Sequence, residues 1–99
     1  MDITDIENIE WNIHLGFKII EKHIINNLDH NYIKNTDFWY LILNNTETYL
    51  NYYKKTKNIK VLPYITWFIE NWPPKLNKNK KLLLPKKNPP PEVLLSELI

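Results

Sequence analysis

The apolar residues of the first thirty positions follow two periodicities at once. From Ile6 to Leu28, seven of them recur at the three- and four-residue spacing of a helix. From Ile9 to Leu15, apolar residues also alternate strictly with polar ones, which is the period of a β-strand. The pattern alone therefore fits either one long helix or a strand followed by a helix.

A single helix would place Trp11, Leu15 and Ile19 opposite the main apolar stripe, so that two sides of it would need burial. A strand followed by a helix avoids this requirement, and the only glycine of the chain stands where the strand would end. We therefore predict a strand at about 8–15 and a helix at about 17–29.

Three further apolar blocks favour strands by their composition. The residues Phe38–Leu43 are all apolar or aromatic, as in a short buried strand. Tyr49–Tyr53 and Ile59–Ile69 are rich in aromatic or β-branched side chains. The predicted fold class is therefore α+β, with a small antiparallel sheet packed on one main helix.

An all-α fold is the alternative for the same blocks. It makes 37–53 one helix and 63–72 a second, with Pro63 in the first turn, where a missing backbone N–H costs no hydrogen bond. The lack of glycine-containing hairpin turns favours this version, whereas the side-chain types favour strands.

The last quarter of the chain differs in composition from the rest. Residues 73–91 hold six of the seven prolines and six lysines without an acid, which predicts an extended basic arm. Residues 1–72, with seven lysines against nine acids, are predicted to form the globular body. Leu82–Leu84 would clip the arm onto it, and Pro90–Glu92 would begin a short C-terminal helix. Arm and helix, residues 73–99, are expected to pack on the body or on a partner subunit.

Missing residue types exclude many kinds of site. The chain has no cysteine, one glycine and one serine, which excludes thiolate zinc sites and phosphate-binding glycine loops and leaves no basis for a serine triad. His14, His23 and His30 fit no standard zinc spacing. We therefore expect no enzyme activity, no cofactor and no metal.

Two lysine-rich segments form a candidate nucleic-acid interface. Their ammonium groups could hold phosphates while nearby aromatic rings stack on bases, as in single-strand binders. The lysines are Lys54, Lys55, Lys57, Lys60, Lys75, Lys78, Lys80, Lys81, Lys86 and Lys87. The aromatic residues are Tyr49, Tyr52, Tyr53, Tyr64 and Trp67. Against this interpretation, a core needs the same aromatic residues, and arginine, the best base-reading side chain, is absent.

The C-terminus forms a candidate partner-binding segment. Leu94, Leu95, Leu98 and Ile99 would share one side of a short helix. So few residues form no stable helix in isolation. The segment must therefore dock on its own domain, in the groove of a partner, or on a second copy in a homodimer.

The bias towards Ile, Asn, Lys and Tyr, with aromatic blocks such as Asn8–Gly16 and Tyr64–Pro74, resembles small accessory proteins of archaeal filamentous viruses. These are proteins of the lipothrixvirus and rudivirus groups, many of unknown function, and some small members inhibit host CRISPR defence. The resemblance implies a viral protein that tolerates heat and acid, which one glycine, seven prolines and no cysteine suit. No functional residue is carried over, because no motif is matched position by position.

These observations lead to one leading hypothesis and one alternative. The leading hypothesis is a non-enzymatic viral accessory protein that binds a host or viral protein, alone or as a homodimer, and opposes host defence. The alternative is a nucleic-acid-binding module. No apolar run approaches the roughly 20 residues that span a bilayer, and the N-terminus is acidic, so we expect no membrane association and a place in the host cytoplasm.

Overall fold

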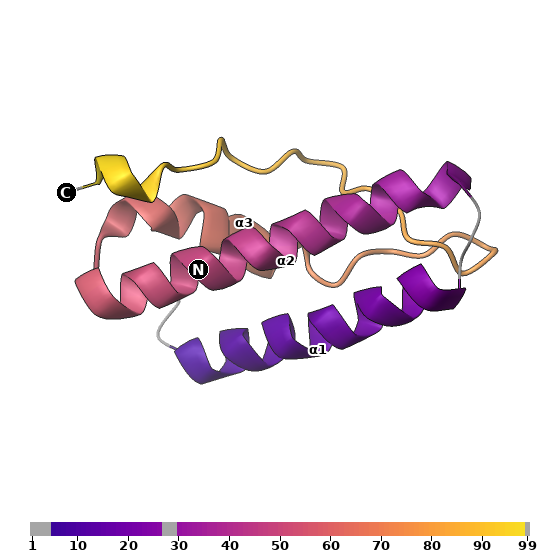
Figure 1. The fold of residues 1–99 in the computed structure, drawn as a ribbon, viewed down its shortest axis with the longest axis horizontal. Helices are drawn as coiled ribbons and strands as arrows, with labels where there is room; N and C mark the ends of the chain where they lie inside the picture. Colours follow the sequence, from indigo (N-terminus) through magenta and orange to yellow (C-terminus); the bar gives the residue numbers. More distant parts are fainter. Residues whose placement is uncertain (1–4, 27–29, 99) are drawn as a thin grey trace.

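The computed structural model describes residues 5–26 and 30–98, and side chains within 5–25 and 34–98. Its elements, in chain order, are helix α1 (Ile6–Asn26), helix α2 (His30–Thr56), the 3₁₀ turn η1 (Ile59–Val61), helix α3 (Leu62–Asn71) and the 3₁₀ turn η2 (Leu95–Glu97). α2 lies in the middle of the molecule, between α1 on one side and α3 with the extended C-terminal arm on the other (Figure 1).

The α+β prediction is wrong, and the all-α alternative fits the structure. Within the described residues, extended pairing is limited to one antiparallel bridge between Leu76 and Leu82. α1 runs without a break through the predicted strand at 8–15. α2 likewise includes both Phe38–Leu43 and Tyr49–Tyr53.

The block Ile59–Ile69 is also helical, not a strand. It contains η1 and most of α3, and Pro63 lies in the first turn of α3, as the all-α alternative predicts. Asn58 begins this block because its side-chain oxygen accepts a hydrogen bond of 3.0 Å from the backbone N–H of Lys60. Capping of this kind satisfies an amide that has no partner within the turn.

The apolar run Phe38–Leu43 is helical because α2 is covered from two directions. Trp39, Ile42 and Leu43 are buried, whereas Tyr40 and Leu41 point outward and are exposed. In a helix, consecutive residues point in different directions, so a central helix can bury neighbouring apolar residues against different partners. A continuous apolar run therefore does not require a strand in this position.

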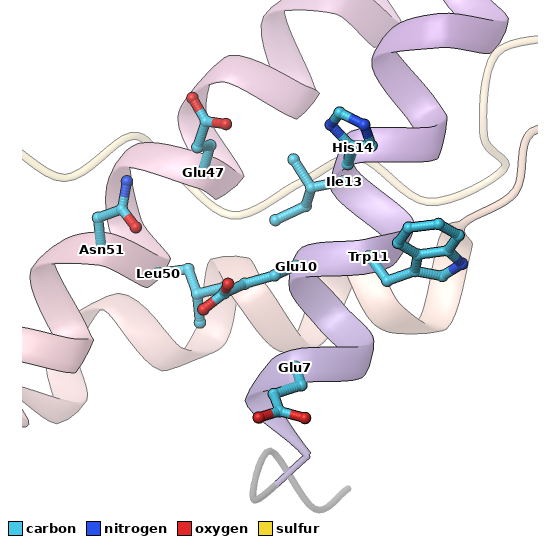
Figure 2. A pocket seen from close by; sticks show the side chains of 8 residues that line it. All are labelled: Glu7, Glu10, Trp11, Ile13, His14, Glu47, Leu50 and Asn51. Carbon is cyan, nitrogen blue, oxygen red and sulfur yellow. The ribbon is translucent and has the colours of Figure 1, made fainter.

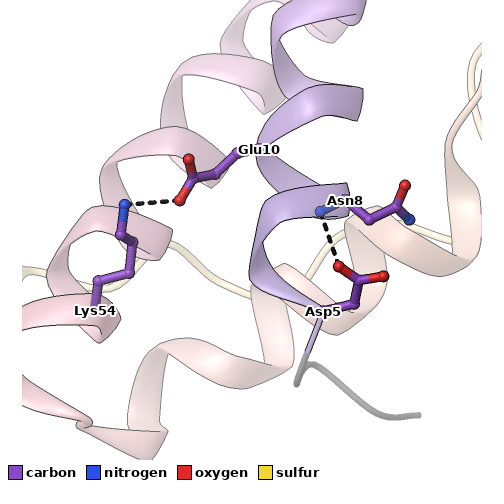
Figure 3. Close-up of polar contacts among 4 residues, drawn as sticks. All are labelled: Asp5, Asn8, Glu10 and Lys54. Atoms are coloured by element: carbon purple, nitrogen blue, oxygen red, sulfur yellow. Dashed lines mark hydrogen bonds and ion pairs between the residues drawn. The ribbon is translucent and has the colours of Figure 1, made fainter.

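α1 begins at a side-chain cap and packs along one stripe. The backbone N–H of Asn8 donates to Oδ1 of Asp5 at 3.0 Å (Figure 3), which satisfies one free amide of the first turn. Ile9, Ile13 and Ile20 of this stripe are buried. They place α1 firmly on the rest of the core, and the opposite side of the helix is left towards solvent.

The C-terminal arm lies on its own body, parallel to α2 (Figure 1). The indole Nε1 of Trp39 donates to the carbonyl of Leu83 at 2.8 Å, and that of Trp67 donates to the carbonyl of Lys87 at 3.0 Å. Further along, the Tyr49 hydroxyl accepts from the N–H of Val93 at 2.9 Å and lies 3.3 Å from the same residue's carbonyl. Side chains of α2 and α3 thus satisfy polar groups of an extended backbone that runs outside any sheet over most of its described length.

The predicted helix from Pro90–Glu92 onward does not form as expected. The chain stays extended through Val93 and makes only the three-residue turn η2. The hydroxyl of Tyr49 contacts both the N–H and the carbonyl of Val93, and this carbonyl would accept an internal hydrogen bond if the helix formed. Leu82–Leu84 were predicted to attach the arm to the body. The buried Leu82 side chain and the carbonyl of Leu83 make this attachment, while the side chains of Leu83 and Leu84 are exposed.

Candidate functional site

An uncovered apolar stripe follows the outer side of α1. Trp11, Leu15 and Ile19 are spaced four residues apart, which places them in one row along the helix. Trp11 is 58% exposed, Ile19 is 42% exposed and Leu15 is half-buried. In Figure 2 the Trp11 side chain extends from α1, and together with Glu47 and Leu50 of α2 it lines the pocket between these two helices. This row is the second face that a continuous helix was expected to bury, and the structure leaves it open.

A groove runs beside this stripe, between α1 and the end of α3. Its volume is about 280 Å³ and its lining is largely apolar. Its α1 wall consists of Leu15 and Ile19 together with Asn8, Ile9 and Asn12. The opposite wall contains Phe68, Ile69, Trp72 and Pro73. We call the stripe and this groove together the α1–α3 surface.

The α3 wall of the groove is held by ring packing in the core. The Trp72 ring stacks on Phe68 with centroids 5.5 Å apart and meets Trp39 edge-on at 5.7 Å. Both Phe68 and Trp39 are buried. Aromatic pairs in these geometries fix one another in position. The position of Trp72 in the groove wall is therefore set by its contacts with Phe68 and Trp39.

On the other flank of α1 lies a more polar pocket of about 420 Å³, between α1 and α2 (Figure 2). Glu7, Glu10, Glu47 and His14 are among its lining residues. Nζ of Lys54 lies 2.7 Å from Oε1 of Glu10 and neutralises that carboxylate (Figure 3). Among the described residues, no three histidine, aspartate or glutamate side chains are grouped closely enough to hold a metal ion.

The structure divides the candidate nucleic-acid lysines between the two ends of the molecule. Lys54, Lys55, Lys57 and Lys60 lie at the carboxyl end of α2 and in η1, whereas the hairpin of 75–83 lies near the opposite end of the long axis (Figure 1). Lys86 and Lys87 belong to the arm, and Lys87 lines a pocket with Ile59 of η1. The lysines therefore do not form one basic surface.

The aromatic residues proposed to stack on bases are mostly part of the core. Tyr49, Tyr64 and Trp67 are buried, and Tyr49 meets Tyr64 edge-on with centroids 4.9 Å apart. Tyr52 and Tyr53 are half-buried, and the Tyr53 ring faces Nζ of Lys57 at 5.3 Å. Stacking on a base requires an open ring face, so these residues do not form a platform beside the lysines.

The hairpin of 75–83 has a tight turn organised by Asn77. Its Oδ1 accepts from the backbone N–H of Asn79 at 2.8 Å and of Lys81 at 3.1 Å. Lys80 adopts the left-handed conformation (φ 61°) that such turns require. The turn brings Lys81 near His23 of α1, and burial first and the Lys81 charge second hold the pKa of His23 below its usual 6.5.

This environment of His23 predicts a pH-dependent stability. Because the folded pKa lies below the unfolded value, its contribution is fully present above about pH 6.5 and is lost as the pH falls through the folded pKa. We expect the urea midpoint of the wild type to fall between pH 7.5 and 5.5, and that of His23→Gln to fall less. Equal slopes for the two proteins would contradict this assignment. Lys81→Gln is the companion variant, with an intermediate slope expected because it removes only the second cause.

The C-terminal leucines are divided between the core and the surface. Leu95 and Leu98 pack against the core cluster, whereas Leu94 is exposed. Ile99 lies outside the described residues. The Nδ2 of Asn58 donates to the carbonyl of Leu98 at 3.4 Å, which ties this end to the start of η1. Of the four candidate partner-binding residues, the three that the structure describes therefore do not lie on one exposed face.

The residues of the α1–α3 surface were not recognised as a site from the sequence. The signal was present, because Trp11, Leu15 and Ile19 form a second helical stripe, but it led to the prediction of a strand. The α3 wall had no sequence signal of its own, since Phe68 and Trp72 come next to α1 only through the tertiary fold.

Comparisons with known proteins give no family for this chain. No protein-family model, no curated protein and no solved structure matches it. In the described part of the chain, no helix combines the length and apolar character needed to cross a membrane.

Proposed function

We propose that this chain is a non-enzymatic accessory protein that acts by binding another protein through the α1–α3 surface. The observation that carries the proposal is the open row of Trp11, Leu15 and Ile19 beside an apolar groove. An exposed apolar patch beside an apolar groove is typical of a protein-binding site. An exposed tryptophan is also the side chain that most often dominates binding energy at interfaces.

The shape of the surface favours a helical partner. A row at four-residue spacing, next to a groove between two helices, is the arrangement into which an amphipathic helix docks. Its apolar residues would enter the groove between Ile19 and Trp72, and its polar side would face water. On the sequence resemblance to archaeal viral proteins, the proposed role is that of a viral accessory protein acting on a host or viral protein, including one of host defence.

A nucleic-acid role receives less support from the same structure. The ten candidate lysines lie at separate places along a molecule 43 Å long. The tyrosines and tryptophan meant to stack on bases are largely buried. Protein binding through the α1–α3 surface uses Trp11 and Ile19, whose side chains are already exposed, and it is therefore the function that we propose.

The proposal predicts that protein capture depends on the outer row of α1. The full chain would be immobilised and exposed to an extract of a heat- and acid-loving archaeon, in parallel with the variants Trp11→Glu and Ile19→Glu. We expect a set of proteins retained by the wild type to be lost by both variants, because a buried charge opposes docking of an apolar face.

Ile59→Glu is the matched control. Ile59 is 70% exposed but lies in η1, outside the α1–α3 surface. It should retain the same proteins as the wild type. Capture that is equal for all four proteins, or absent for the wild type, would refute the proposed function.

A further inference from the structure

We propose that the α1–α3 surface binds a second copy of this chain, with the two α1 helices antiparallel and each Trp11 seated in the groove of the other copy. The inference rests on the proposed function, since it names the occupant of the same surface. It follows from three features of α1: the self-complementary order of its outer row, the distribution of its charges and the fit of an indole to the groove.

The outer row of α1 is complementary to itself. Trp11 projects from the surface four residues before Leu15, and Ile19, which borders the groove, follows four residues after it. A two-fold axis through Leu15 therefore sets Trp11 of each copy opposite Ile19 of the other. An isologous interface needs this property, because the same patch must supply both the projecting residue and the site that receives it.

The charges beside the row favour the antiparallel direction. Exposed Glu7 lies about two turns before Leu15, and exposed Lys22 lies about two turns after it. Antiparallel pairing about Leu15 places each Glu7 opposite position 23 of the other copy and next to its Lys22, where opposite charges attract. Parallel pairing would place each of these charges near its own counterpart and would be repulsive.

The groove suits an indole in size and in chemistry. Its volume of about 280 Å³ exceeds what one indole ring occupies, and its walls include the Trp72 ring and Ile19. An entering indole would find an aromatic partner on one wall and an aliphatic one on the other. Two tryptophans, related by symmetry, would then be removed from water by a single association event.

The limited area of the surface sets the expected affinity. The row and groove involve one side of a 21-residue helix and the end of α3. A standard stable interface buries roughly 800 Å² on each partner, from about 20 to 30 residues a side. We therefore expect a weak dimer, with a dissociation constant of roughly 10–200 µM.

The test is sedimentation velocity of the full chain from about 5 to 500 µM at low salt. We expect the weight-average sedimentation coefficient to rise with concentration from the monomer towards the dimer value for the wild type and for Ile59→Glu. Trp11→Ala should stay monomeric over the same range. Because Trp11 is 58% exposed, this variant should keep its fold, and circular dichroism would verify that it does.

The charge pair tests the direction of the helices. Glu7→Lys and Lys22→Glu should each weaken the dimer about three-fold or more, and the double variant should return it towards the wild-type affinity. A monomeric wild type at 500 µM, a dimer that Trp11→Ala leaves intact, or a double variant no tighter than either single one would each overturn the inference. A dimer that is indifferent to Trp11 would point instead to exchange of the C-terminal arm.

The two proposals fail in different ways. A chain that is monomeric at every concentration, yet captures proteins only when Trp11 is present, would keep the proposed function and exclude the second copy as occupant. A Trp11-dependent dimer that captures nothing else would leave self-association as the role of the surface.

Discussion

Replacement of Trp39 by alanine is expected to lower the free energy of unfolding by about 4 kcal/mol, a large part of the roughly 5–15 kcal/mol typical of a domain of this size. Trp39 is 1% exposed and lies where α2, α3 and the arm meet. Its ring stacks on Trp67 with centroids 6.1 Å apart and meets Trp72 edge-on at 5.7 Å. Alanine would leave a cavity among these rings and would also remove the donor to the carbonyl of Leu83.

The measurement is urea denaturation at low protein concentration, with unfolding monitored by circular dichroism. Trp39→Phe separates the two losses, because it retains an aromatic ring but lacks the Nε1 donor, and we expect it to cost about 1–2 kcal/mol. Trp11→Ala is the matched control on an exposed tryptophan, with a change within about 0.5 kcal/mol. A loss below about 2 kcal/mol for Trp39→Ala would mean that the ring cluster does not anchor the fold.

The prolines of the chain predict its local structure better than its aromatic and β-branched blocks do. The arm is extended and lies where its prolines begin, and Pro63 starts a helix as the all-α alternative requires. The predicted sheet is absent from the described residues because β-favouring side chains also pack well in a central helix. Tyr49 and Tyr64 were assigned to strands by type, yet they meet edge-on between α2 and α3.

The error in α1 has a specific physical cause. The strand at 8–15 was preferred on the assumption that Trp11, Leu15 and Ile19 must be buried. The structure satisfies the pattern with one helix and leaves that row partly exposed. Periodicity shows which residues share a face, but it does not show whether a face is covered by the same chain. The row that misled the fold prediction is therefore the one that identifies the candidate site.

The candidate site also depends on a contact that no local pattern reveals. The groove exists because Trp72, just after α3, lies against α1 at the position of Gly16. The sequence shows that Gly16 is the only glycine, which suggested the end of a strand. In the structure it lies inside α1, where glycine disfavours a helix by about 1 kcal/mol relative to alanine. Its presence is explained by the close approach of its neighbours.

Gly16→Val is accordingly expected to destabilise the protein by about 2–3 kcal/mol. A Cβ atom at this position would lie 2.7 Å from Cδ2 of Leu43 and 2.9 Å from Cζ2 of Trp72. Leu43 is fully buried, and Trp72 is held by its contacts with Phe68 and Trp39, so neither can move aside freely. The two added γ-carbons of valine increase the overlap beyond that of Cβ alone.

Two comparisons separate this overlap from helix propensity. Lys22→Val places the same residue at an exposed position of α1, and it should cost only about 0.5 kcal/mol. The cost of Gly16→Ala should lie between the costs of these two valine variants. Alanine has a higher helix propensity than glycine, and this gain opposes an overlap that is smaller than that of valine. Urea denaturation of the three variants measures the order, and Gly16→Val no worse than Lys22→Val would contradict the packing explanation.

A double-mutant cycle with Leu43→Ala completes the argument. Removal of the Leu43 side chain makes room beside residue 16, so Gly16→Val should cost at least 1 kcal/mol less in that background than in the wild type. The cycle also bears on the groove, because the same Cβ position faces Trp72. A double variant that regains stability but does not form the Trp11-dependent dimer would show that the core has recovered. It would also show that Trp72 is displaced and that the groove is closed. Equal costs in both backgrounds would show that overlap with Leu43 does not cause the destabilisation by Gly16→Val.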